Sequence, residues 1–401
     1  MIGMHIAFAW FGAVGYVLIQ VLEELAKKTW KPHTYTILVR RDTISDELHA
    51  LQIAANVVIV WDMPKFFAEG TGLAEDVDWM INCATPMFNK GIMQWCLHNN
   101  SNYMDFASIL WPEDVRAGCV QQDEFHEAFL KAGLLAVVNA GISPGLTDVL
   151  TWYLIKKHNI TPVSYNLYLD ENFNSMVPLF SWSPSVALDE VLTPAFVLDD
   201  GVVRFDKPFT LIGYCVGNKC FNYYEITQEE LLNMYHHYKD SLRSLKIAVG
   251  WTEIEHIKLL YTMGLLSDEQ RVGELSLLDI VKSKMPKAAT KEEMIDAMEK
   301  WLIDDAWFSF HIELGGHDKM HIVRAVFDFD AFKDLKNTSY YGATSISYPT
   351  GIAAGYIWGL AQAFTQKGVV SCLDIWLWVA ETDIVDLIDA MNNKWITINI
   401  E

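Results

Sequence analysis

The chain is poor in basic residues. Its 401 residues include 30 lysines and arginines against 51 aspartates and glutamates, a formal net charge of −21. Nucleic acids and anionic membranes both require a basic surface, so neither is expected as a partner. Low-complexity tracts are absent and 51% of the residues are hydrophobic, so we expect a chain that folds throughout, into two or three domains.

Cysteine is also scarce. The six cysteines form neither a CxxC motif nor a compact framework, which is typical of reduced thiols in a cytoplasmic protein. A membrane segment is not expected either. Residues 1–22 are apolar, but His5 and Gln20 interrupt the run, glycines lie in its middle, and no basic segment precedes it.

The same stretch carries the first functional signal. A strand-like run, His5–Trp10, is followed by a turn and then by apolar residues at helical spacing over Tyr16–Leu25. The turn consists of Gly12, Ala13, Val14 and Gly15. Strand, glycine turn and helix in this order predict a dinucleotide-binding unit, in which backbone N–H groups approach a pyrophosphate. Trp10 occupies the first glycine position of that motif, and an ordinary connection with incidental glycines is the alternative.

The end of the second predicted strand bears on the choice of cofactor. An acidic residue there would bind the ribose hydroxyls of NAD, whereas arginine suits the 2′-phosphate of NADP. The strand at 34–40 ends with Arg40 and continues with Arg41 and Asp42. We therefore expect NADP, with NAD possible because of Asp42; an exposed charged turn is the plain alternative. Asp62, after the third strand, is assigned to the same cofactor set.

Strands and helices alternate through the first 140 residues. Runs apolar on both faces predict a doubly wound, mostly parallel sheet, the α/β class of a Rossmann domain. The expected strands are 5–10, 34–40, 57–61, 78–83, 102–106 and 134–139, with helices at 90–98 and 121–132. A further helix at 146–157 is expected to begin with Ser143 as N-cap and Pro144 at its first position, pointing free N–H groups into the ligand crevice.

From about residue 163 the pattern changes to antiparallel strands. These are expected at 163–169, 202–211, 307–314 and 321–329, around helices at 228–238, 253–263 and 287–300, and a buried helix is expected at 349–364. His311, His317 and His321 with Glu313 suggest a metal site across a glycine turn, but their spacing fits no usual zinc set, and no metal is assigned.

Several motifs together resemble the saccharopine dehydrogenase family in its glutamate-forming branch, and are similar to carboxynorspermidine dehydrogenases and homospermidine synthases. Besides the glycine turn, they include Tyr103-Met-Asp105, residues 140–146 (AGISPGL), Phe180-Ser-Trp-Ser-Pro184, Gly250-Trp251, residues 263–266 (MGLL) and residues 347–354 (SYPTGIAA) with 367–369. They occur in family order across nearly the whole chain.

The resemblance implies a Rossmann domain at 1–140, a substrate and dimerisation domain at 141–340, and C-terminal helices at 341–401 that return to the first domain. It also implies hydride transfer between a nicotinamide and a carbon–nitrogen bond of an amino acid or polyamine-derived amine, in a homodimer. Asp105 would face the substrate amine, with a helix cap or turn residue as the plain alternative. Ser181, Trp182 and Ser183 would line the substrate pocket, and a core position is the alternative for Trp182. Ala84, Thr85 and Pro86 would border the cofactor, with Ile142, Pro144 and Gly145 as the floor.

The chain also departs from the family pattern. Ser143 replaces an aspartate and Phe106 a threonine, while Ser185-Val186 and Ile247-Ala248 stand where the family has arginines. Those arginines would pair with a dicarboxylic substrate, so their loss weakens saccharopine itself as the substrate. Together with Trp10 it motivates an alternative function, a catalytically degenerate sensor or scaffold that only binds nucleotide.

Overall fold

The computed structural model describes residues 3–42, 44–70, 72–110, 115, 120–177, 179–216, 219–251, 254–285, 288–374 and 379–401. The chain forms two compact units. Unit 1 comprises Met1–Thr161, Leu232–Lys239 and Tyr348–Lys394, and unit 2 comprises Pro162–Leu231, Asp240–Ser347 and Trp395–Glu401. The domain limits predicted from the family resemblance stay a prediction.

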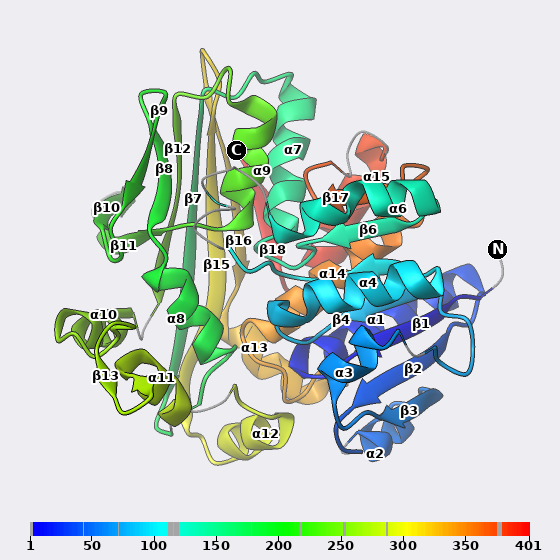
Figure 1. Ribbon diagram of the computed structural model, residues 1–401. Helices are drawn as coiled ribbons and strands as arrows, with labels where there is room; N and C mark the ends of the chain where they lie inside the picture. Colours follow the sequence, from blue (N-terminus) through cyan, green and yellow to red (C-terminus); the bar gives the residue numbers. More distant parts are fainter. Residues whose placement is uncertain are drawn as a thin grey trace. The chain divides into compact units, whose positions relative to one another are not determined.

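Unit 1 is built on a sheet of seven strands in the order β17-β6-β5-β4-β1-β2-β3, all paired in parallel. The strands are β1 (His5–Ala9), β2 (Thr34–Val39), β3 (Ala55–Ile59), β4 (Trp79–Asn82), β5 (Asn102–Met104), β6 (Leu135–Val138) and β17 (Gly368–Ser371). Figure 1 shows the helices that flank this sheet. The predicted doubly wound α/β fold is confirmed.

The helices of unit 1 largely follow the apolar periodicity of the sequence. They are α1 (Ala13–Thr29), α2 (Ser45–Ala50), α3 (Met63–Ala68), α4 (Asn89–Asn99), α6 (His126–Ala132), α7 (Leu146–His158), α15 (Glu381–Asn392), most of α9 (Glu229–Tyr238) and most of α14 (Ser347–Ala361). The helix predicted at 121–132 begins as a 3-10 turn, η2 (Gln121–Phe125), and a second such turn, η1 (Pro86–Phe88), precedes α4. Among the residues described, no helix is both long and apolar enough to cross a bilayer.

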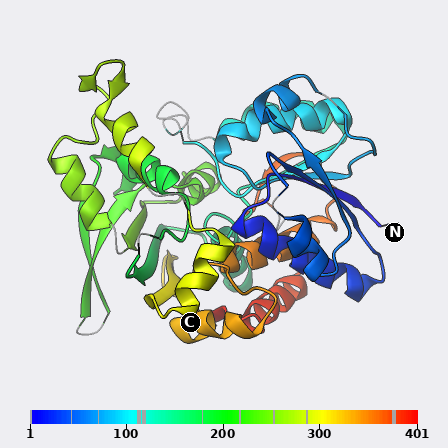
Figure 2. The same ribbon diagram turned by 90° about the horizontal axis from the view of Figure 1, so that it is seen from below.

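Most of the C-terminal segment returns to unit 1, as the resemblance implies: Tyr348–Lys394 belong to unit 1, whereas the last residues, Trp395–Glu401, belong to unit 2. Strand β17 pairs in parallel with β6, and sequence analysis did not predict it. Figure 2 shows the orange and red helices of this segment beside the blue helix α1. Three glycines of α14 make that close approach possible: Gly351, Gly355 and Gly359 face Val17, Val21 and Leu25 of α1, in that order. A side chain at any of the three glycines would meet α1.

The start of α7 differs from the prediction. The helix begins at Leu146, with Gly145 at the N-cap position, so Ser143 and Pro144 lie in the preceding turn. The Ser143–Pro144 peptide bond is cis. Gly145 has a φ of +125°, and a Cβ there would lie 2.3 Å from the carbonyl oxygen of Gly141. The turn therefore closes on itself before the helix starts, which only glycine permits at this position.

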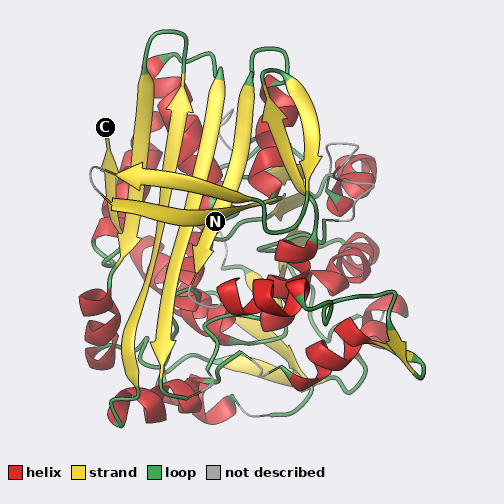
Figure 3. Ribbon diagram, turned by 90° about the vertical axis from the view of Figure 1, so that its left-hand side faces the viewer, coloured by secondary structure: helices red, strands yellow, loops and turns green. Residues whose placement is uncertain are grey.

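Unit 2 is built on a nine-stranded sheet in the order β10-β11-β12-β7-β15-β16-β18; off this path, β8 pairs with β12, and β9 pairs with β8. Figure 3 shows its long strands side by side. The pairing is antiparallel, as expected, except between β7 and β12. The strands are β7 (Ser164–Ser175), β8 (Ala195–Asp199), β9 (Val202–Asp206), β10 (Leu211–Val216), β11 (Lys219–Ile226), β12 (Ser244–Trp251), β15 (Ile303–Gly315), β16 (Met320–Phe327) and β18 (Thr397–Ile400).

The single strand predicted at 202–211 was wrong, because a turn closed by Thr210 N–H and the Lys207 carbonyl separates β9 from β10. Helices α8 (Pro184–Leu192), α10 (Ile254–Thr262), α11 (Leu277–Lys284), α12 (Lys291–Glu299) and α13 (Phe329–Asp334) belong to unit 2, together with the turn η3 (Leu335–Asn337) and a short ribbon of β13 (Arg271–Val272) and β14 (Leu275–Ser276).

Candidate active site

The glycine turn lies where β1 ends and α1 begins. Helix α1 has Gly12 at its N-cap, and its first intrahelical bond runs from the Tyr16 N–H to the Gly12 carbonyl (2.9 Å). The N–H groups of Ala13, Val14 and Gly15 precede this bond, and the first turn contains no acidic residue. A 17-residue helix with such a start favours an anionic group at its N-terminus.

The two glycines of the turn have different surroundings. A Cβ on Gly15 would lie 3.2 Å from Phe11 Cδ2 and 3.4 Å from Cys83 Sγ, so this glycine allows the close packing of α1 on the sheet. A Cβ on Gly12 would meet no protein atom within 4 Å. Gly12 therefore faces open space, which leaves room for a ligand to approach the backbone.

Trp10 adopts the backbone conformation of the glycine that it replaces. Its φ is +73°, in the left-handed region, and its N–H donates to the carbonyl of Leu38 (3.1 Å). The indole stacks on the ring of Phe88 with centroids 5.7 Å apart, and the guanidinium carbon of Arg40 lies 4.7 Å from the centre of an indole ring. The bulky residue thus keeps the turn and adds an aromatic surface beside it.

The two acidic residues at the predicted cofactor site, Asp42 and Asp62, accept hydrogen bonds within the chain. Asp42 accepts hydrogen bonds from the backbone N–H (3.1 Å) and the hydroxyl (2.7 Å) of Ser45, and these bonds lower the pKa of the Asp42 carboxyl. Asp62 caps helix α3 by accepting the Lys65 N–H (3.0 Å). Arg40 and Arg41 are exposed at the end of β2. At this edge of the sheet the two arginines are therefore more available to a ligand than the two aspartates.

The segment 84–86 lies at the carboxyl end of β4, next to β1 in the sheet. The N–H of Ala84 donates to Asn82 Oδ1 (2.9 Å), and Thr85 and Pro86 lead into the turn η1. This edge of a parallel sheet, beside the strand that leads into the glycine turn, is where ligands bind in doubly wound folds. The segment stays a predicted border of the cofactor.

Asp105 lies in a buried polar network at the same edge. Its side chain is 1% exposed, and both of its oxygens accept hydrogen bonds: Oδ1 from the N–H of Asn139 (2.7 Å), and Oδ2 from Gln122 Nε2 (2.9 Å) and the Tyr103 hydroxyl (2.8 Å). Burial raises the pKa of Asp105 to about 6, although its three hydrogen bonds oppose the shift. In this geometry the carboxylate anchors the ends of β5 and β6.

The network extends through residues that sequence analysis missed. The amide of Asn82 donates to Asn89 Oδ1 (2.7 Å), and the hydroxyl of Ser108 donates to Asn139 Oδ1 (2.7 Å). Asn139 is fully buried, and its Nδ2 has no hydrogen-bond partner within the described part of the chain. The signal for these residues was available, since Asn82 ends β4 and Asn139 directly follows β6, but isolated asparagines after strands also occur in plain turns.

The turn before α7 supplies less than was expected. The N–H groups of Leu146 and Thr147 donate to the carbonyls of Gly141 (3.0 Å) and Ile142 (3.2 Å), so the expectation that they point free into the crevice was wrong. The turn places Ile142, Pro144 and Gly145 after β6, again at the carboxyl edge of the sheet.

The predicted substrate residues lie in unit 2. Ser181 is buried, and its carbonyl accepts a hydrogen bond from Thr344 Oγ1 (2.7 Å). The Trp182 ring meets the Trp251 ring edge-on with centroids 5.8 Å apart. Ser183 is the N-cap residue of α8, and its hydroxyl lies 3.0 Å from that of Ser185. Their assignment to the substrate pocket stays a prediction.

The histidines of the β15–β16 hairpin do not converge. His311 pairs with Arg324 and His321 with Leu314, which puts the two histidine side chains on opposite faces of the sheet. His311 Nε2 lies 3.9 Å from Glu313 Oε1. Within the described ranges, no group of three or more histidine, cysteine, aspartate or glutamate side chains is arranged to hold a metal ion.

Comparisons with known proteins add two likenesses. The chain is 25% identical over 230 residues to a carboxyaminopropylagmatine dehydrogenase of Synechocystis sp.; the match covers 54% of this chain and 56% of the relative, just over half its length. An apo saccharopine dehydrogenase (L-Glu forming) from Saccharomyces cerevisiae has the same fold, with a TM-score of 0.64, 14% identity, and coverage of 100% of both chains. No family model matches the chain.

Proposed function

Because the chain is saccharopine dehydrogenase-like in sequence and fold, we propose that it is an NAD(P)-dependent oxidoreductase acting on a carbon–nitrogen bond. It would reduce an imine in one direction and oxidise a secondary amine in the other. The proposed substrate is a saccharopine-like amino acid or a carboxylated polyamine. The observation that carries this proposal is the glycine turn between β1 and α1, at the carboxyl edge of the seven-stranded parallel sheet.

The turn fits the pyrophosphate of a dinucleotide. Gly12 faces open space, and the N–H groups of Ala13, Val14 and Gly15 lie at the positive end of α1 without a competing acidic side chain. Because the net charge of the chain is −21, these local donors must offset a repulsive overall field. We propose that they hold the two phosphates.

The second part of the proposal is a preference for NADP. Arg40 and Arg41 are exposed at the end of β2, and Arg40 is held against the indole of Trp10. Asp42, the residue that would favour NAD, already accepts two hydrogen bonds from Ser45. A guanidinium at this position pairs well with the 2′-phosphate, whereas the carboxylate is turned toward the chain itself.

When bound, the nicotinamide supplies the hydride chemistry. The segment Ala84, Thr85 and Pro86 is proposed to border the cofactor, with Ile142, Pro144 and Gly145 as its floor. Asp105 stays our proposal for the carboxylate that serves the substrate amine. Because it is buried and both of its oxygens accept hydrogen bonds within the chain, it would do so through the residues that it holds and not by direct contact. Asp105 would also have a structural role, because it accepts a hydrogen bond from the N–H of Asn139 and thereby fixes the start of the turn at 140–145.

The substrate is constrained by what the chain lacks. Ser185-Val186 and Ile247-Ala248 replace the arginines expected of an enzyme for a dicarboxylic amino acid. We therefore favour the carboxylated polyamine, in keeping with the activity named for the Synechocystis relative. We further propose that the protein is a cytoplasmic homodimer.

A turnover assay tests the proposal. Carboxyaminopropylagmatine and saccharopine would each be supplied with NADP⁺ and with NAD⁺, and reduced nicotinamide followed by its absorbance. We expect reduction of NADP⁺ with the polyamine derivative, faster than with saccharopine. The Asp105→Asn variant should lower kcat while the dissociation constant for NADPH stays within about threefold. No reduction with either substrate and either cofactor would contradict the enzymatic proposal.

Trp10 favours a second candidate, a sensor that binds the nucleotide without turning it over. Its indole lies between Arg40 and Phe88, at the position where the family has a glycine. In the same assay, binding of NADPH to the wild-type chain together with no turnover on either substrate would support the sensor.

A further inference from the structure

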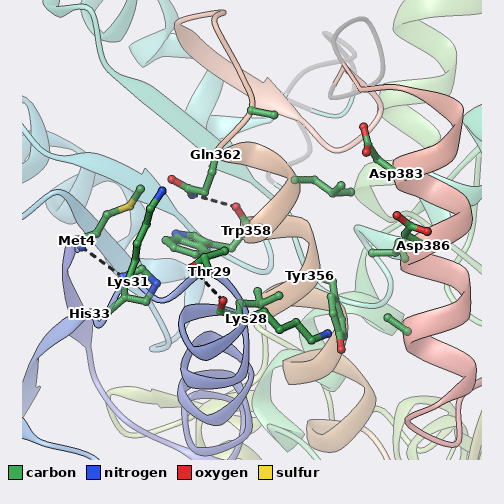
Figure 4. A pocket seen from close by; sticks show the side chains of 16 residues that line it. Met4, Lys28, Thr29, Lys31, His33, Tyr356, Trp358, Gln362, Asp383 and Asp386 are labelled. Carbon is green, nitrogen blue, oxygen red and sulfur yellow. Dashed lines mark hydrogen bonds between the residues drawn. The ribbon is translucent and has the colours of Figure 1, made fainter. Parts of the chain in front are cut away.

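A cavity of about 510 Å³ lies within unit 1, away from the glycine turn. It is formed by the C-terminal end of α1, by α14 and α15, and by the residues just before β1 and β2, as Figure 4 shows. Its lining includes Met4, Leu25, Lys28, Lys31, His33 and Trp358. The volume is typical of pockets for small molecules.

The cavity is separate from the proposed cofactor site. Met4 and His33 precede β1 and β2, whereas Trp10 and Arg40 follow the same two strands. Strands of five and six residues at about 3.3 Å per residue place the two ends of the sheet about 16 Å apart or more. The cavity therefore lies at the amino edge of the sheet, and no part of the proposed hydride-transfer chemistry uses it.

The centre of the cavity is apolar. Trp358 on α14 is 2% exposed and lines it, with its ring edge-on to the ring of His33 (centroids 5.4 Å apart). Leu25 of α1 and Leu387 of α15 also line the cavity. The close packing of Gly359 against Leu25 brings α14 near α1 at this level, so the apolar lining is part of the helix interface.

The rim carries opposite charges on its two sides. Figure 4 shows Lys31 and His33 on one side of Trp358, and Asp383 and Asp386 projecting from α15 on the other. Asp383 also accepts the N–H of Ala380 (3.0 Å), which fixes its carboxylate at the start of α15. Burial lowers the pKa of His33, so the positive charge on its side of Trp358 comes from Lys31 at neutral pH.

We propose that this cavity is a second ligand site, which takes an elongated zwitterion with an apolar body. The carboxylate of the ligand would face Lys31, its ammonium would face Asp383 and Asp386, and its methylene chain would lie on Trp358. Charges of opposite sign on opposing sides of an apolar cavity select such a molecule over a purely anionic or purely cationic one. The inference does not depend on the proposed oxidoreductase activity.

Three matched probes test the charge pattern: 8-aminooctanoate, octanoate and octylamine, with binding followed by saturation-transfer NMR on the full chain without cofactor. We expect the zwitterion to bind with a millimolar or lower dissociation constant and more tightly than either singly charged probe. Asp386→Asn should raise the dissociation constants of 8-aminooctanoate and octylamine about two- to fivefold, the range of an exposed ion pair, and leave that of octanoate unchanged. Lys31→Met should weaken the binding of 8-aminooctanoate and of octanoate and leave the binding of octylamine unchanged.

A steric variant tests the location. Ala390 lines the cavity from α15, so Ala390→Trp should abolish binding of 8-aminooctanoate. Val385→Trp is the matched control, because it adds the same side chain to an exposed position of α15 outside the lining. Thermal melting checks that both variants are folded. If Ala390→Trp does not fold, the charge variants Asp386→Asn and Lys31→Met still test the site.

Two results would overturn the proposal: no binding of the zwitterion, or binding that Ala390→Trp, Asp386→Asn and Lys31→Met leave unchanged. Titration with NADPH and with NADH separates this proposal from that of the function. If the chain binds 8-aminooctanoate but neither NADPH nor NADH, the proposed function is refuted and the second site stands. If it binds a cofactor but not 8-aminooctanoate, the proposed function stands and the second site is refuted.

Discussion

The guanidinium carbon of Arg40 lies 4.7 Å from the centre of an indole ring of Trp10. The contact joins the ends of β1 and β2, the two strands whose carboxyl ends meet the pyrophosphate and the adenosine ribose in dinucleotide-binding folds. It gives Trp10 a role that the glycine of the usual motif cannot have. We propose that the indole orients Arg40 for the cofactor.

Removal of the two arginines should weaken the binding of NADPH much more than that of NADH. In Arg40→Ala/Arg41→Ala the dissociation constant for NADPH should rise about tenfold or more, since a charge-assisted bond to the 2′-phosphate contributes about 1.5–3 kcal/mol. That for NADH should change less than about threefold. Isothermal titration measures both, with the surface variant Arg271→Ala of unit 2 as the control. An equal loss for both cofactors would refute the 2′-phosphate assignment.

Trp10 should set the degree of that preference. Trp10→Phe keeps an aromatic face for Arg40 and should retain most of the preference for NADPH. In Trp10→Gly the ratio of the two dissociation constants should fall about two- to thirtyfold, because a cation–π contact contributes about 0.5–2 kcal/mol. If Trp10→Gly instead tightened the binding of both cofactors equally, the indole would be an obstruction in the cleft and not a support for Arg40.

The glycines of α14 should differ in how they tolerate alanine. A Cβ on Gly355 would lie 2.4 Å from Val21 Cγ1, so Gly355→Ala should lower the free energy of unfolding by about 1–3 kcal/mol. A Cβ on Gly359 would lie 3.2 Å from Leu25 Cδ1, the flexible end of that side chain, and the higher helix propensity of alanine offsets the crowding there. Denaturant unfolding of the two variants should show this difference; equal effects would contradict the helix packing.

Asp105 should make stability depend on pH. Its folded-state pKa is raised to about 6 from 3.8, so the folded chain holds this proton to a higher pH than the unfolded chain does. Its contribution is therefore most favourable below about pH 4 and declines as the pH rises to about 6, by about 3 kcal/mol for a shift of this size. The difference in unfolding free energy between wild type and Asp105→Asn should follow that slope, and a difference independent of pH would contradict the burial of the charge.

Much of unit 1 could be predicted from the sequence, because strands buried on both faces of a parallel sheet read as continuous apolar runs. Strand β17 could not, since four residues, Gly368–Ser371, give no periodicity, and their partner β6 lies far away in the sequence. The start of α7 was misread for a related reason. Ser143-Pro144 has the residues of a helix start, but the closed turn at Gly145 depends on a backbone approach that sequence spacing does not reveal.

The candidate site was predicted in outline. The glycine turn, the arginines after β2 and Asp105 all lie at one edge of the sheet, because residues that follow parallel strands must do so. The partners of Asp105 were missed, since Gln122 and Asn139 meet it only through the fold. The contacts of Trp10 with Arg40 and Phe88 could not be predicted either, because these three residues come from separate segments that meet only in the folded chain.

The central claim is that the amino-terminal part of the chain binds a dinucleotide despite Trp10. Isothermal titration of the wild-type chain with NADPH and with NADH tests it most directly. The account predicts saturable binding of one molecule per chain, with NADPH bound more tightly than NADH. Absence of heat for both cofactors in a chain shown to be folded by its thermal transition would contradict it.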